Sequence, residues 1–148
     1  MSKIFAVANQ KGGVGKTTTS VNLAASLSVT RNRVLLVDLD PQGNATMGSG
    51  VDKSSLELSL YDALIDGVPF DKVCVSAAEA GYDLLPSNGD LVAAEAQLFA
   101  MEEREFKLKT LLDAQRTRYD YIIIDCPPSL NMLTINALVA AEGVLIPM

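Results

Sequence analysis

The chain has 148 residues, almost half of them hydrophobic, which is enough to bury the core of one domain. Its net charge of −6 argues against a large nucleic-acid surface, because phosphate contacts need clustered Lys and Arg. Histidine is absent, which excludes every mechanism that needs an imidazole. We expect no membrane span, no signal peptide and two buried thiols, Cys74 and Cys126, which lack metal-ligand spacing.

Apolar runs of strand length alternate with helix-length patterns, which predicts an α/β fold. Continuous runs such as Val34–Val37 and Ile122–Ile124 suit parallel strands that are covered on both faces. We predict strands at Lys3–Ala8, Arg33–Asp38, Lys72–Ser76, Tyr82–Pro86, Tyr121–Asp125 and Val144–Pro147. We predict helices at Lys16–Val29, Leu60–Asp66, Asp90–Ala100, Glu103–Gln115 and Leu130–Ala141.

The connections carry predictions of their own. A right-handed crossover should join the first strand to a parallel neighbour through the first helix. Pro41–Lys53 is rich in Gly, Ser and Asn, which indicates a surface loop. Val144–Pro147 resembles a buried strand, and the chain stops where a ligand-facing loop of a parallel sheet should begin. We therefore expect residues 1–148 to form a single domain that is the N-terminal part of a longer one.

A glycine-rich segment lies between the first predicted strand and the first predicted helix: Lys11-Gly12-Gly13-Val14-Gly15-Lys16-Thr17-Thr18. A strand, a turn ending in Gly-Lys-Thr and a helix form the arrangement of a phosphate-binding P-loop. Its glycines allow backbone N–H groups to approach phosphates closely. In such a loop Lys16 reaches the β- and γ-phosphates, and the Thr17 hydroxyl coordinates Mg²⁺.

The loop departs from the general pattern at two positions. Gln10 stands where the first glycine is expected, and Lys11 is a second lysine. A lysine this early in a tight loop cannot readily fold back onto phosphates bound by its own backbone. It could reach phosphates bound by a second subunit, or it could be a solvated surface residue.

Acidic residues follow two of the predicted strands. Asp38 and Asp40 share one side of the chain, with Leu39 opposite. Carboxylates at a strand end suit hydrated Mg²⁺ or the positioning of an attacking water, although a solvated loop start is the simpler alternative. Tyr121–Asp125 has the Walker B form, in which Asp125 binds Mg²⁺, commonly through a water.

Three segments together resemble the ParA/MinD family of ATPases with a deviant Walker A motif: K-G-G-V-G-K-T-T, D-L-D-P-Q-G-N and D-C-P-P-S. The resemblance implies a P-loop NTPase fold, with a mainly parallel twisted sheet and helices on both faces. It implies ATP and Mg²⁺ as cofactors, with Lys11 contacting nucleotide across a face-to-face homodimer and Lys16 acting within its own subunit. It makes Asp40 the residue that orients the hydrolytic water, and Asp38 an outer-shell Mg²⁺ or switch residue.

Within that family the chain is most similar to the ParA/Soj branch, as in the run D-P-Q-G-N-A-T. The resemblance implies a Mg²⁺-dependent, cytoplasmic and nucleoid-associated ATPase that dimerises on ATP and segregates chromosomes or plasmids with a ParB-like partner. Non-specific DNA would bind mainly through a C-terminal part beyond this chain.

Three alternatives stay open. One is a MinD-like ATPase that positions cell division, and another is a nucleotide-switched regulator without hydrolysis, against which Asp40 and Asp125 argue. The third is a related enzyme, such as a metallochaperone or a dethiobiotin-synthetase-like ligase, for which the sequence shows neither cluster cysteines nor a substrate pocket.

Overall fold

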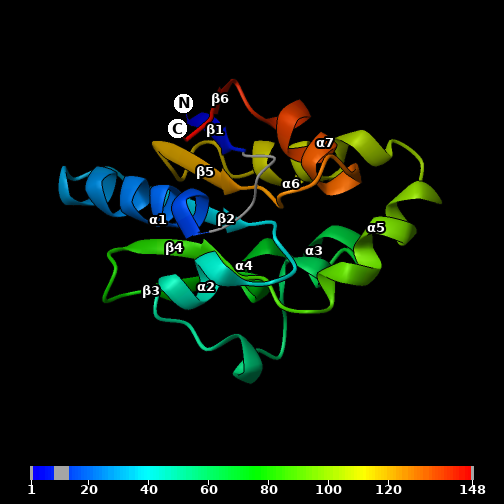
Figure 1. The fold of residues 1–148 in the computed structure, drawn as a ribbon, viewed down its shortest axis with the longest axis horizontal. Coiled ribbons are helices and arrows are strands. Elements are labelled where there is room, and N and C mark those ends of the chain that lie inside the picture. Colours follow the sequence, from blue (N-terminus) through cyan, green and yellow to red (C-terminus); the bar gives the residue numbers. More distant parts are fainter. Residues whose placement is uncertain (1, 9–13, 148) are drawn as a thin grey trace.

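One mixed sheet organises the part of the chain that the computed structural model describes, residues 2–8 and 14–147 without the side chains of residues 14–17. Within these residues the strand order is β3-β4-β2-β5-β1-β6, and every pairing is parallel except β3 with β4 (Figure 1). The strands are β1 (Lys3–Val7), β2 (Val34–Asp38), β3 (Val75–Ala77), β4 (Tyr82–Leu85), β5 (Tyr121–Asp125) and β6 (Gly143–Leu145). The predicted α/β class with a mainly parallel sheet is therefore confirmed.

Helices cover both faces of this sheet (Figure 1). The helices are α1 (Val14–Val29), α2 (Asn44–Gly48), α3 (Leu60–Ile65), α4 (Phe70–Val73), α5 (Leu91–Phe99), α6 (Lys107–Asp113) and α7 (Met132–Ala140), with 3₁₀ turns η1 (Lys53–Ser55) and η2 (Arg104–Phe106). No helix among these described segments is both long and apolar enough to cross a bilayer.

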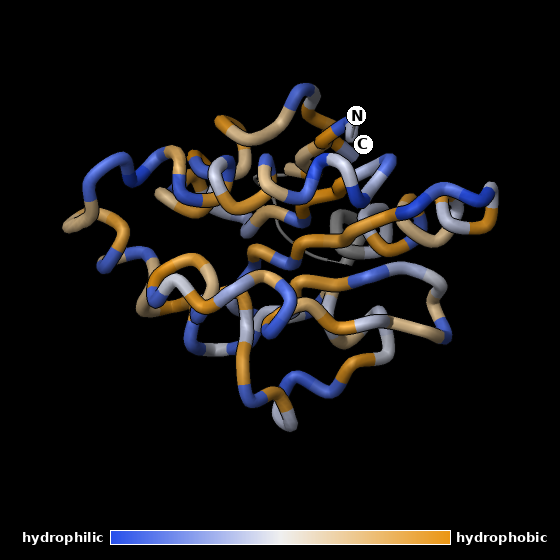
Figure 2. Tube along the Cα trace, turned by 180° about the vertical axis from the view of Figure 1, so that it is seen from behind, coloured by the Kyte–Doolittle hydropathy of each residue, from blue (hydrophilic) through white to orange (hydrophobic). Residues whose placement is uncertain are grey.

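The core consists of two apolar clusters, one on each face of the sheet. Ile122 and Ile124 of β5 pack under α3 to α7, whereas Ile123 packs under α1 and α2. Figure 2 shows hydrophobic residues along the central strands and hydrophilic residues at the outer turns. The continuous apolar runs thus occupy strands that are buried on both sides.

The crossover prediction is wrong in one respect. The connection through α1 runs from β1 to β2, but these strands are not neighbours, because β5 lies between them and pairs with both. Ile122–Ile124 is buried completely, so this strand suits the middle of the sheet better than an edge.

Pro41–Lys53 is not entirely a loop, because it contains helix α2. Gly43 adopts the left-handed conformation with φ 68°, which allows the chain to turn into the helix. The Asp38 carboxylate then accepts the backbone N–H of Thr46 at 2.8 Å, which fixes the short helix against the sheet. The group that stabilises α2, the Asp38 carboxylate, belongs to β2, so the composition of Pro41–Lys53 alone did not indicate a helix.

Three further boundaries need correction. The predicted strand Lys72–Ser76 begins as helix α4, because Phe70 and Val73, one turn apart, both bury against the core. The predicted helix Glu103–Gln115 is divided into η2 and α6, and Glu103 has a positive φ of 53°. The predicted buried strand Val144–Pro147 is the exposed edge strand β6, which pairs only with β1 among the described strands.

Candidate functional site

The predicted phosphate loop connects the carboxyl end of β1 to the first turn of α1. Strand β1 ends at Val7 and helix α1 begins at Val14, so the predicted strand and the predicted helix flank this segment. Lys11, Gly12 and Gly13 lie outside the described residues, and so do the side chains of Val14, Lys16 and Thr17. Thr18 is exposed on α1. The N-terminus of this 16-residue helix provides N–H groups and a positive dipole end at that edge of the sheet.

Two buried carboxylates lie side by side at the same edge. Asp38 ends β2 and Asp125 ends β5, and the two residues are direct partners in the parallel register. Both are fully buried. The Ser20 hydroxyl of α1 donates a 2.7 Å hydrogen bond to Asp125 Oδ1. The sheet therefore brings together Asp38 and Asp125, two of the three residues that the sequence predicted as metal ligands; the side chain of the third, Thr17, lies outside the described part of the chain.

Asp38 accepts three hydrogen bonds in this position. Thr46 donates its backbone N–H to Oδ2 at 2.8 Å and its hydroxyl to the same oxygen at 2.7 Å, and Asp40 donates its backbone N–H to Oδ1 at 3.2 Å. Burial and, secondarily, the charge of Asp125 raise the pKa of Asp38 to about 7, against the lowering effect of these hydrogen bonds.

This pair of oxygen donors fits a hard divalent cation. Two neighbouring buried carboxylates repel each other, and a cation between or beside them would offset that repulsion. No cluster of three or more His, Cys, Asp or Glu side chains occurs within residues 2–8 and 14–147, apart from the undescribed side chains at 14–17. Any cation here would therefore take only part of its coordination from described side chains of these types.

Asp40 lies two residues beyond Asp38 in a tightly bonded turn, and it is almost completely buried. Its Oδ1 accepts the backbone N–H of Gln42 at 3.0 Å. Its carbonyl oxygen accepts the backbone N–H of Gly43 at 2.9 Å and the hydroxyl of Ser87 at 2.6 Å. The predicted water-orienting carboxylate thus has a fixed backbone next to the acidic pair.

The segment after Asp125 returns the chain to helix α7. Cys126 is buried, and its N–H bonds the Val7 carbonyl oxygen at 3.1 Å. Both cysteines are free thiols, but Cys74 is only partly buried, which corrects half of that prediction. Asn131 accepts the Thr134 N–H at 3.1 Å as the N-cap of α7.

Four side chains that support the site were missed from the sequence: Ser20, Thr46, Ser87 and Glu95. Ser87 follows β4 at the ligand-facing edge of the sheet, so the strand-end rule could have found it. Thr46 is a polar residue in a segment predicted as a loop, and Ser20 and Glu95 lie on the predicted helices Lys16–Val29 and Asp90–Ala100. Glu95 accepts the N–H groups of Met132 and Leu133 at 2.6 and 3.1 Å.

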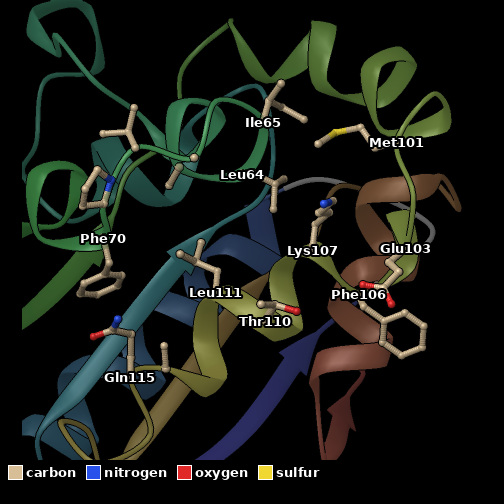
Figure 3. Close-up of a pocket in the computed structure, with 15 residues that line it drawn as sticks. Leu64, Ile65, Phe70, Met101, Glu103, Phe106, Lys107, Thr110, Leu111 and Gln115 are labelled. Atoms are coloured by element: carbon tan, nitrogen blue, oxygen red, sulfur yellow. The ribbon is translucent and has the colours of Figure 1, made fainter.

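A separate cavity of about 490 Å³ lies between α3, α6 and the segment that follows α5 (Figure 3). None of the predicted site residues lines it. Its walls are mostly apolar, with Leu64, Phe70, Met101, Phe106 and Leu111, and Lys107 is on the same wall as Leu111.

Comparison with known proteins finds a family model and relatives that match almost the whole chain. A family model described as an AAA domain matches residues 2–148. The sporulation initiation inhibitor protein Soj of Bacillus subtilis is 52% identical over 147 residues, which are 99% of this chain and 58% of Soj. The chromosome partitioning protein ParA of Myxococcus xanthus is 47% identical over 148 residues, which are 100% of this chain and 52% of that protein. The chain thus spans about half the length of these curated relatives.

A solved structure is similar over the whole chain as well. It is described as cobyrinic acid a,c-diamide synthase from Mycobacterium smegmatis with a bound ATP analogue and magnesium. It superposes with a TM-score of 0.96 at 45% sequence identity and covers 100% of this chain and 60% of that one.

Proposed function

Because the chain belongs to the AAA domain family, whose model spans residues 2–148, we propose that it is the nucleotide-binding part of a Mg²⁺-dependent partition ATPase of the ParA/Soj type. The observation that carries this proposal is the buried pair of Asp38 and Asp125, which lies at the sheet edge where α1 begins. We also propose that residues 1–148 form one P-loop domain that continues into a longer one, since the named relatives are longer.

In this proposal the backbone of residues 11–18 and the N-terminus of α1 bind the phosphates of ATP. Lys16 binds phosphate within its own subunit, and Lys11 binds the nucleotide of a second subunit. Thr17, Asp38 and Asp125 hold Mg²⁺, a role that the buried oxygen donors of the two aspartates fit. The bound MgATP supplies the phosphoryl group and the cation that neutralises its developing charge.

Asp40 orients the attacking water in the proposed reaction. Phosphoryl transfer depends on positioning more than on a strong base, so a rigidly placed carboxylate suffices. The hydrogen bonds of Asp40 to Gln42, Gly43 and Ser87 support this assignment, because they fix both its side chain and its peptide group.

The wider cycle also belongs to the proposal. ATP binding produces a homodimer, the dimer binds non-specific DNA in the cytoplasm at the nucleoid, and a ParB-like partner stimulates hydrolysis. The name of ParA, a chromosome partitioning protein, supports a role in partition. The net charge of −6 favours DNA contacts mainly outside this part of the protein.

The test is ATP hydrolysis by the protein as its gene encodes it, with and without non-specific DNA and the ParB-like partner. Asp40→Ala should still bind MgATP and dimerise but should hydrolyse ATP roughly 100-fold more slowly, because the attacking water is no longer oriented. Asp66→Ala, which removes an exposed carboxylate on another segment, is the matched control and should behave as the parent.

Each competing function predicts a different outcome of this test. Normal turnover by Asp40→Ala would reject the role of Asp40. A lack of stimulation by both DNA and partner would reject the partition function and favour a related enzyme, such as the synthase named for the similar structure. ATP-dependent binding to lipid vesicles in place of DNA would favour a MinD-like ATPase.

A further inference from the structure

A closed ring of hydrogen bonds surrounds the turn that carries Asp40. Its members are Asp38, Asp40, Thr46 and Ser87, and we call it the Thr46 ring. Asp40 N–H donates to Asp38 Oδ1, Thr46 donates to Asp38 Oδ2, Ser87 N–H donates to Thr46 Oγ1 at 2.9 Å, and the Ser87 hydroxyl donates to the Asp40 carbonyl oxygen. All four side chains are buried, so water has little access to replace a missing member.

We propose that Thr46 is a positioning residue for hydrolysis, which fixes the Asp40 turn against the end of β4 through the Thr46 ring. This inference rests on the proposed function, since it assigns to Thr46 a role in the reaction that Asp40 is proposed to assist. Thr46 itself has no direct contact to reacting groups in this proposal.

The donor and acceptor pattern explains why a hydroxyl is needed at this position. A backbone N–H can only donate, so Thr46 Oγ1 must accept from Ser87 and can give its single hydrogen only to Asp38. Valine has the shape of threonine but makes neither bond. Serine has the hydroxyl and makes both.

The ring acts on Asp40 through the backbone on both sides of that residue. Asp38 accepts the Asp40 N–H at 3.2 Å, and Ser87 donates to the Asp40 carbonyl oxygen at 2.6 Å. Thr46 connects these two anchors, because it binds the Asp38 carboxylate and the Ser87 N–H at once. Strands β2 and β4 are already paired up to Val37 and Leu85, so the Thr46 hydroxyl acts beyond their ends. Without it, Ser87 keeps its bond to the Asp40 carbonyl oxygen but loses its connection to Asp38, and the Asp40 turn is held less firmly.

A second feature shows that the Asp40 turn and the end of β4 are closely packed. A Cβ atom on Gly43 would lie 3.1 Å from the Ser87 carbonyl oxygen, so the turn has no room for a side chain there. Ser87, the residue that limits the space at Gly43, is also a member of the Thr46 ring. A displacement of Ser87 is therefore transmitted directly to residues 40–43.

The kinetic signature separates positioning from mere structural support. A residue that acts through Asp40 affects the transition state, so its loss should lower kcat by roughly 10- to 100-fold with little change in KM for ATP. A residue that only stabilises the fold should lower the melting temperature and leave kcat of the folded protein unchanged.

The experiment compares Thr46→Val, Thr46→Ser and Ser87→Ala in steady-state MgATP hydrolysis by the protein as its gene encodes it. Thr46→Val and Ser87→Ala should lower kcat, and Thr46→Ser should restore most of it. Ser87→Ala removes a hydroxyl that bonds Asp40 and not Asp38. A lower kcat in this variant therefore cannot be explained by weaker metal binding at Asp38. Thr30→Val removes an exposed hydroxyl at the end of α1 and should leave kcat unchanged.

Combination with Asp40→Ala completes the design. Once Asp40 is absent, Thr46→Val should cause no further loss of kcat, because both changes remove the same contribution. Normal kcat in Thr46→Val or in Ser87→Ala, in a protein where Asp40→Ala is slow, would overturn this inference and leave the proposed function intact. A parent protein without ATP hydrolysis would instead overturn the proposed function. If Thr46→Val does not fold, Ser87→Ala and Thr46→Ser carry the test.

Discussion

Glu95 should stabilise the fold through helix α7, to which it is bonded from helix α5. Its carboxylate accepts the first N–H groups of α7, from Met132 at 2.6 Å and from Leu133 at 3.1 Å. These N–H groups have no partner within their own helix, so Glu95→Ala leaves two donors to water or to nothing. Hydrogen bonds to a charged group contribute about 1.5–3 kcal/mol, and partial exposure of Glu95 places the loss near ~2 kcal/mol.

Thermal unfolding gives the measurement. For a domain of this size, a loss of ~2 kcal/mol lowers the melting temperature by about 4–8 °C. Glu102→Ala, at an exposed position beyond α5, is the matched control and should stay within about 0.5 kcal/mol of the parent. In hydrogen exchange, the amides of Met132 and Leu133 should exchange faster in Glu95→Ala. Equal stability of the two variants would refute the reasoning, because the carboxylate would then not cap the helix.

Two further predictions concern the edge of the sheet at the site. Folding raises the pKa of Asp38 from an ordinary 3.8 to about 7, so the folded state binds this proton more tightly than the unfolded state. The free energy of unfolding of the nucleotide-free parent should therefore fall, relative to that of Asp38→Asn, as pH rises from about 4 to about 7. The fall should be at most ~4 kcal/mol. Urea titrations across this range measure the difference, and a pH-independent difference would contradict it. Gly43→Ala combines φ 68° with contacts at 2.8 Å to Lys53 Cδ and 3.1 Å to the Ser87 carbonyl oxygen. Gly43→Ala should lower the free energy of unfolding by about 1–3 kcal/mol in the same assay. The loss should exceed that of Gly67→Ala, because Gly67 has φ 70° but open space around it. Equal losses in the two variants would show that the close contacts at Gly43 contribute nothing.

The strands at the centre of the sheet could be predicted because their signal is local. Strands β2 and β5 are continuous apolar runs that end in a carboxylate, and their predicted bounds agree with the structure within one residue. The order of strands was not predictable in the same way. Nothing in the sequence of β1 or β2 shows that β5, more than eighty residues later, lies between them. The position of β5 depends on contacts with distant parts of the chain, which bury Ile122–Ile124 completely.

The same distinction applies to the candidate site. A carboxylate at the end of a buried strand pointed to Asp38, and the Walker B form pointed to Asp125. The groups that hold these carboxylates in place come from other elements. Ser20 and Thr46 form their hydrogen bonds with Asp125 and Asp38, which are 105 and 8 positions away, so neither contact is visible in a local pattern.

Both helices over the acidic pair are bonded to it through hydroxyl groups. Ser20 connects α1 to Asp125, and Thr46 connects α2 to Asp38. Because the two aspartates are register partners, a change of charge at either one acts on both helices at once. Helix α1 also begins at the predicted phosphate loop, and α2 directly follows the turn of Asp40. A cation at this pair would therefore act on helix α1 and on the turn of Asp40 together, and a nucleotide-dependent switch requires such coupling.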